Sequence, residues 1–206
     1  MKIFYKTILE THTHEIPKIK WSRFIGSIFH VKNKEEAESI IKDFKEQNKD
    51  ATHNCYAYTC GTNINYDLFG NLEITPDYFR QNDDGEPANT AGKPILAQIQ
   101  WHNLHNILLI VTRYFWWTLL WVGGLIQAYS ECAKQTILNA KIENLEITKK
   151  MKIVCDYNEL WTVINFLKKH DAKILNQENG EKTTIEFEIN KGKKVDFSAL
   201  DVKEMG

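Results

Sequence analysis

The stretch RYFWWTLLWVGGLIQAYS, Arg113 to Ser130, decides how this chain folds. From Ile107 to Ile126 the sequence carries one charged side chain, Arg113, and is long enough to cross a hydrocarbon core of about 30 Å as a helix. Three features oppose a membrane helix: the charge lies inside the span, the aromatic residues gather at its middle, and Gly123-Gly124 interrupt the helical pattern. We expect a buried strand from Asn106 to Phe115 instead.

A helix is expected to follow this strand, opening at Gly124. Its apolar and small residues recur at helical spacing on one face: Leu125, Tyr129, Cys132, Ala133, Thr136, Ile137 and Ala140. Upstream, Asn33 is predicted to cap another helix, whose apolar face comprises Ala37, Ile40, Ile41 and Phe44. The remaining elements expected in this half are strands at Lys2–Leu9, Lys18–Val31 and Asn54–Cys60, and a short helix at Pro94–Gln100.

Between Asn63 and Lys93 the sequence is rich in Asp, Asn, Gly and Pro, which is typical of a long, exposed and specifically shaped loop. Composition changes again near residue 140. Beyond it the pattern predicts strand, helix, strand, strand and a terminal helix, at Leu145–Cys155, Tyr157–His170, Ala172–Gln177, Thr183–Ile189 and Phe197–Glu204. The prediction is an α+β chain of two domains, residues 1–140 and residues 141–206, the second a ferredoxin-like β-α-β-β unit.

Composition narrows the classes of function. The formal charge is −1, from 26 basic and 27 acidic residues, so no overall field draws the protein onto a polyanion. The four cysteines have irregular spacing without a CxxC pair, and the first residues do not resemble a secretory signal, which favours a reducing cytoplasm. His53, Cys55 and Cys60 match no standard zinc spacing. We therefore expect no metal and no cofactor.

Five motifs appear in one order: SRFIG (Ser22–Gly26), ATHNCYAY (Ala51–Tyr58), DDGEPANTAGKPIL (Asp83–Leu96), VTRYF (Val111–Phe115) and GGLIQAYS (Gly123–Ser130). In this order they resemble the IMPACT/YigZ family of small cytosolic proteins, across essentially the whole chain. The resemblance implies an N-terminal α/β domain with the fold of the second domain of ribosomal protein S five. It also implies a C-terminal ferredoxin-like domain similar to a domain of translation elongation factor G.

The same resemblance implies a link to translation. Eukaryotic members of the family regulate translation under stress by binding proteins. Bacterial members look like nucleic-acid or ribosome-associated proteins without an established activity. On this basis the expected partner is a ribosome-associated protein or RNA, and no membrane is expected to be involved.

The chain departs from the family pattern at its six tryptophans. Trp116, Trp117 and Trp121 stand at places where the family has glycine, and Trp21, Trp101 and Trp161 stand where it has small or polar residues. A glycine turn before a helix is a natural anion cradle, which bulky side chains would obstruct. Whether these tryptophans are natural or introduced is left open by the sequence.

Three carboxylates, Asp83, Asp84 and Glu86, lie within four residues of the DDGEP loop. They could hold a divalent cation or act as acid and base, but we favour a solvated turn that hydrogen-bonds its own backbone, with Asp at the turn start and Gly85 at positive φ. Arg113 either binds an anion with Lys93 or pairs with one of these carboxylates and so pins the loop to the sheet. The candidate binding residues are Asp83, Asp84, Glu86, Thr90, Gly92, Lys93, Arg113, Gly123 and Gly124; catalytic residues are unknown.

Two further patterns lead to surface predictions. His102 and His105 flank the turn before the buried strand, and we expect both to face solvent. Lys149, Lys150 and Lys152 form a basic run that is expected on a strand edge, where RNA phosphate could contact it. Acidic residues balance the lysines of this region, so a solvated surface is the default interpretation.

Three hypotheses of function follow. The first is a non-catalytic binding or regulatory protein linked to translation. The second is an enzyme acting on a phosphorylated or anionic small molecule, which requires that Asp83, Glu86, Lys93 and Arg113 converge in one cleft. The third is an engineered or diverged variant that self-associates through a patch formed by Trp116, Trp117 and Trp121.

Overall fold

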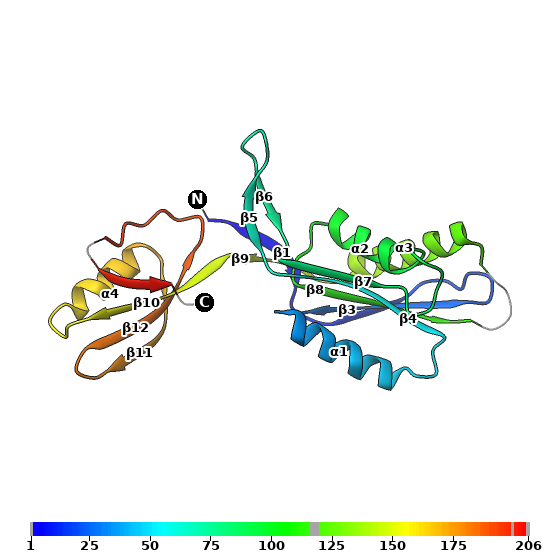
Figure 1. Cartoon of the computed structure of the whole chain (residues 1–206), viewed down its shortest axis with the longest axis horizontal. Helices are drawn as coiled ribbons and strands as arrows, with labels where there is room; N and C mark the ends of the chain where they lie inside the picture. Colours follow the sequence, from blue (N-terminus) through cyan, green and yellow to red (C-terminus); the bar gives the residue numbers. More distant parts are fainter. Residues whose placement is uncertain (1, 116–119, 199, 205–206) are drawn as a thin grey trace. The chain divides into compact units, whose positions relative to one another are not determined.

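The computed structural model describes residues 2–115, 120–198 and 200–204 of the chain (Figure 1). The chain folds into two compact units. The larger unit is Tyr5–Asn144, and the smaller unit combines Met1–Phe4 with Leu145–Gly206. Both units contain helices and antiparallel strands, so the chain is a two-domain α+β protein.

The larger unit is built on a five-stranded antiparallel sheet. Helix α1 covers one face of this sheet, and helices α2 and α3 cover the other (Figure 1). The strands in spatial order are β2 (His12–Glu15), β3 (Arg23–His30), β8 (Ile107–Tyr114), β4 (His53–Cys60) and β7 (Tyr78–Asn82). The helices are α1 (Lys34–Gln47), α2 (Gly92–Trp101) and α3 (Val122–Asn139).

The central strand β8 explains why its sequence is almost continuously apolar. Ile107, Leu109 and Val111 belong to the core under α2 and α3, whereas Leu108 and Ile110 belong to the core under α1. Successive side chains of a strand point to opposite faces, and here both faces are covered, so every one of these positions is buried. The expected strand is therefore confirmed, as are the helix capped by Asn33 and the apolar face of α3.

The stretch from Arg113 to Ser130 forms the end of β8 and the first half of α3. Residues 116–119 between them lie outside the described residues, so the predictions for Trp116 and Trp117 concern positions that the structure does not describe. Within the described ranges, no helix combines the length and the apolar character needed to span a membrane.

The interpretation of residues 63–93 as one long loop is wrong in its first half. Strands β5 (Asn63–Tyr66) and β6 (Leu72–Thr75) form a separate hairpin, and β7 joins the main sheet as an edge strand beside β4. Asp67 organises the hairpin turn, because its carboxylate accepts hydrogen bonds from the Asn71 side chain and from the backbone N–H groups of Phe69 and Asn71. These hydrogen bonds, that of the Asn71 side chain first, lower the pKa of Asp67.

A second correction concerns the strand predicted from Lys18 to Val31. Its first residues form a tight turn instead, in which the Ile19 and Ser22 backbones exchange hydrogen bonds of 3.0 and 2.9 Å. The two central residues, Lys20 and Trp21, both have positive φ, 45° and 67°. Two central residues with positive φ favour Asn-Gly or Gly-Gly, so the Lys20-Trp21 backbone is strained in this turn.

The turn between α2 and β8 contradicts another expectation. His105 is buried, with 3% of its surface exposed, instead of facing solvent. Its backbone N–H donates to the Lys6 carbonyl on β1 (Phe4–Ile8), and β1 pairs with β9 (Ile142–Glu146). A strand more than ninety residues away in the sequence thus covers this histidine, which local sequence cannot indicate.

The smaller unit is a four-stranded antiparallel sheet in the order β11-β12-β10-β13 with helix α4 (Leu160–Lys169) packed on one face. The expected terminal helix is wrong, because residues 201–204 form strand β13, which pairs with β10 and brings Val202 against the core. The strands are β10 (Thr148–Cys155), β11 (Lys173–Asn179), β12 (Thr183–Asn190) and β13 (Asp201–Glu204).

The basic run lies on β10, which is an inner strand of this sheet and not an edge. Lys150 stands opposite Glu188 on β12, and Lys152 stands opposite Glu186. Opposite charges on neighbouring strands stabilise the pairing locally and leave little net positive field for an RNA phosphate.

Met1–Phe4 belongs to the smaller unit because Ile3 is hydrogen-bonded into it. The Ile3 N–H donates to Asn190 Oδ1, and Asn190 Nδ2 donates back to the Ile3 carbonyl, both at 3.1 Å. The same carbonyl accepts from the Ile147 N–H at 3.0 Å. The two ends of the sequence therefore complete one domain.

Replacing Trp21 by glycine is expected to stabilise the protein. Trp21 is 74% exposed and has φ of 67°, so glycine removes backbone strain and little packing is lost. The free energy of unfolding, measured by urea denaturation, should rise by about 1 kcal/mol.

The matched control is Trp101→Gly. Trp101 is also well exposed, at 84%, but it is the last residue of α2, where glycine costs up to about 1 kcal/mol. Equal changes in the two variants would show that positive φ is not what strains the Trp21 turn.

Candidate functional site

The candidate site is centred on a buried ion pair between Arg113 and Glu86. Arg113, at the end of β8, is 3% exposed, and Glu86, in the DDGEP loop, is 8% exposed. Arg113 Nη1 donates to Glu86 Oε1 at 2.6 Å, and Nη2 donates to Ser22 Oγ at 3.2 Å. The prediction that Arg113 pins the loop to the sheet is confirmed, and Glu86 is the carboxylate that it binds.

The same carboxylate oxygen receives a second hydrogen bond. Tyr129 on α3 donates its hydroxyl to Glu86 Oε1 at 2.8 Å. The single proton of the Cys55 thiol is shared between two acceptors, the Asp83 carbonyl at 2.9 Å and Tyr129 Oη at 3.4 Å. Burial is the main cause that raises the pKa of Tyr129 and of Cys55, so both stay protonated and act as donors at neutral pH. The centre is a closed network that ties β4, β8, α3 and the loop together.

Asp83 stabilises the start of α2. Its carboxylate accepts hydrogen bonds from three backbone N–H groups, those of Asn89 at 2.9 Å, Ala91 at 3.0 Å and Gly92 at 2.8 Å. The Ala91 and Gly92 N–H groups are unpaired donors at the N-terminus of α2, which a carboxylate satisfies well, and the Asn89 N–H belongs to the loop before it. Gly92 is required here because a Cβ would lie 2.7 Å from the Asn82 backbone nitrogen.

Asp84 holds the other side of the loop. Its carboxylate forms an ion pair with Lys45 of α1 and accepts the Asn54 N–H at 2.6 Å, while its carbonyl contacts His53 Nδ1 at 2.9 Å. Asp84 and Gly85 both have positive φ, 46° and 89°. The prediction of a solvated turn that hydrogen-bonds its own backbone is correct for Asp83 and for the positive φ of Gly85, but it is wrong for Glu86, which is buried.

The remaining candidate residues lie around this network. The Thr90 hydroxyl donates to the Pro87 carbonyl at 2.7 Å and closes the loop. Lys93 is exposed in the first turn of α2. Gly123 and Gly124 lie in the first turn of α3, and a Cβ on Gly123 would meet nothing within 4 Å.

A cavity of about 420 Å³ lies beside the loop, between Pro87 and the start of α3, and is lined by Pro87, Leu120, Trp121 and Val122. Its lining is apolar. The enzyme hypothesis asked for Asp83, Glu86, Lys93 and Arg113 in one cleft, but Asp83, Glu86 and Arg113 are hydrogen-bonded to the protein itself. The arrangement favours a rigid surface over a reactive centre.

The structure adds three residues that the sequence did not single out as part of this centre: Ser22, Cys55 and Tyr129. Tyr129 was assigned to the apolar face of α3, which is correct for its ring, since it packs edge-on against Phe24. Its hydroxyl lies within reach of Glu86 only through the packing of α3 on the sheet. The sequence pointed to these residues only in that each lies in one of the motifs that carry the family resemblance: SRFIG, ATHNCYAY and GGLIQAYS.

Fold and site together define a two-domain α+β protein whose DDGEP loop is fixed to the sheet by a buried ion pair. Residues 20–137 match the family model of the Impact N-terminal domain. The chain is 34% identical over 185 residues to the IMPACT family member YvyE of Bacillus subtilis (strain 168), covering 89% of this chain and 78% of that protein. The chain belongs to the IMPACT family.

Two further likenesses agree with this assignment. The IMPACT family member YigZ of Escherichia coli (strain K12) is 30% identical over 187 residues, covering 89% of this chain and 85% of that protein. A crystal structure described as a hypothetical protein matches with a TM-score of 0.71 at 27% identity, covering 100% of this chain and 98% of that one. The likeness in structure therefore extends over both domains.

Glu86→Gln is expected to lower the free energy of unfolding by about 3 kcal/mol, because it leaves the buried Arg113 charge without its partner. The change keeps the size of the side chain, so packing is preserved. Urea denaturation of the purified full chain measures the effect.

Glu15→Gln is the matched control, since Glu15 forms a bidentate pair with Arg23 at 2.9 Å on the surface. Exposed pairs contribute about 1 kcal/mol or less. A loss in Glu86→Gln no larger than that of the control would show that the buried pair does not hold the loop.

Proposed function

We propose that the protein is a non-catalytic binding protein linked to translation, which contacts a ribosome-associated protein or RNA through its larger domain. Membership of the IMPACT family supports the link to translation. The observation that carries the non-catalytic part is that Asp83, Asp84 and Glu86 are all engaged by the fold. Carboxylates that the protein itself engages in this way favour a fixed surface over reaction with a substrate.

The proposed contact surface is the loop together with the first turns of the two helices beside it. Lys93 supplies a positive charge at the start of α2, and Gly123 leaves the backbone of α3 open to a partner. The positive end of the α3 dipole attracts anionic groups, such as nucleic-acid phosphates or acidic side chains, whereas at α2 the Asp83 carboxylate already occupies the helix N-terminus and Lys93 supplies the attraction. The overall charge of −1 is small, so the attraction acts locally.

Capture of partners from a cell lysate tests this proposal. The full chain should recover ribosomal proteins or RNA at low salt, and recovery should fall as salt rises, since charge attraction is screened. Lys93→Glu should reduce recovery by about tenfold, because it places a repelling charge at the contact.

Lys134→Glu, on the exposed side of α3, makes the same change in charge away from the loop and should leave recovery unchanged. Equal recovery with both variants would mean that the loop surface is not the contact. If no ribosomal component is recovered under any salt condition, the link to translation itself is wrong.

Self-association is a second candidate, favoured by the exposure of the tryptophans. Trp21, Trp101, Trp121 and Trp161 are 74%, 84%, 84% and 70% exposed, although large aromatic side chains are usually buried for most of their surface. Sedimentation across a wide range of protein concentrations should show a rising average mass. A variant with glycine at these four positions should stay monomeric, and a constant monomer mass in the unchanged chain would contradict this candidate.

A further inference from the structure

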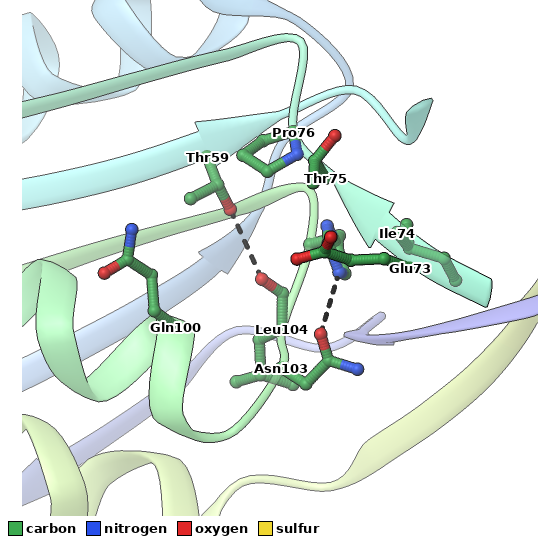
Figure 2. Close-up of a pocket in the computed structure, with 9 residues that line it drawn as sticks. Thr59, Glu73, Ile74, Thr75, Pro76, Gln100, Asn103 and Leu104 are labelled. Atoms are coloured by element: carbon green, nitrogen blue, oxygen red, sulfur yellow. Dashed lines mark hydrogen bonds between the residues drawn. The ribbon is translucent and has the colours of Figure 1, made fainter. Parts of the chain in front are cut away.

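A second cavity lies in the larger unit, at the base of the β5–β6 hairpin. It has a volume of about 260 Å³ and is bounded by β6 on one side and by the turn between α2 and β8 on the other (Figure 2). Its polar lining consists of Thr59, Glu73, Thr75, Gln100, Asn103 and His105. It is separate from the loop site, because Thr59 pairs with Ile107 at the opposite end of β4 and β8 from the pair formed by His53 and Arg113.

Glu73 provides the charge of this cavity. Figure 2 shows its side chain extending from β6 into the space that Thr59, Leu104 and Asn103 face. Within the described part of the chain, neither a hydrogen bond nor an ion pair engages its carboxylate. This contrasts with the loop carboxylates, each of which has partners.

The buried imidazole of His105 forms an uncharged part of the cavity wall. Its Nε2 lies 3.2 Å from Asn103 Oδ1, and because that oxygen can only accept, Nε2 carries the proton. Nδ1 is then an acceptor, and it is buried without a hydrogen-bond partner among the residues that the structure describes. Burial lowers the pKa of His105, so the ring is uncharged at neutral pH.

The lining therefore carries a single negative charge, since Glu73 is its one acidic residue and its one histidine, His105, is neutral. Such a site attracts a cation with N–H donors and repels phosphates and carboxylates. Ile74, Pro76 and Leu104 complete the lining with apolar surface that suits a short alkyl chain. A cavity of this size accommodates a small molecule only.

We propose that this cavity binds the ammonium or guanidinium group of a small aliphatic amine, with Glu73 as the anionic partner. Carboxylate pairs with these cations are among the strongest hydrogen bonds that proteins form. The bound amine would contact β6 on one side and Gln100 or Asn103 on the other. The site does not depend on the proposed contact with translation components.

Calorimetric titration of the full chain tests the proposal, with putrescine and agmatine as the ammonium and guanidinium probes. At least one of them should bind with one site per chain, while acetate and inorganic phosphate should not. Glu73→Gln should weaken binding by about tenfold or more, because the charge-assisted hydrogen bonds are lost. Glu73 is exposed and unpaired among the described residues, so thermal unfolding should be unchanged by this substitution.

Glu46→Gln is the control, as it removes the same charge from an exposed position on α1, which covers the opposite face of the sheet from α2. Its affinity should equal that of the unchanged chain. Absence of binding by both amines overturns the proposal, as does an equal loss in the two variants, which would indicate attraction to the surface in general. Binding of acetate or phosphate as tight as that of the amines overturns it as well.

Discussion

The ion pair between Glu86 and Arg113 is the interaction on which the larger domain depends. Burying two charges is costly, and the cost is offset only where further hydrogen bonds satisfy the charged groups. Tyr129 supplies one to Glu86, and Ser22 accepts one from Arg113. Because Ser22 follows a strained turn and Tyr129 lies on α3, the pair fixes the positions of three segments that are remote in sequence.

The sequence predicted well those elements whose hydrophobic pattern is complete within the element itself. Strand β8 is apolar throughout because both its faces are covered, and α3 shows the helical period of its buried face. Strand β13 was missed because its short, polar sequence becomes a strand only by pairing with the distant β10. The hairpin β5–β6 was missed because its four-residue strands lie within a stretch rich in Asn, Asp and Gly, which is typical of a loop. Burial of His105 has the same origin, since the covering residue belongs to β1.

The candidate site was predictable in its residues but not in their roles. The loop carboxylates were identified from the sequence. Whether they bind a ligand or the protein itself could be decided only from the structure, which shows the hydrogen-bond partners of their oxygens. Asp83 satisfies the start of α2, Asp84 holds Lys45, and Glu86 holds Arg113. Glu73 carries the same functional group, yet nothing in its sequence context distinguishes a carboxylate that faces a cavity from one that faces bulk water.

The hydrogen bonds between Ile3 and Asn190 give the chain a built-in order of assembly. Residues 5–144 form the larger domain, so this domain can fold while synthesis continues. The smaller domain needs Ile3 as well as Asn190, so it can close only after Asn190 has been synthesised. Until then, the backbone N–H and carbonyl of Ile3 lack the Asn190 side chain that they bind in the folded domain.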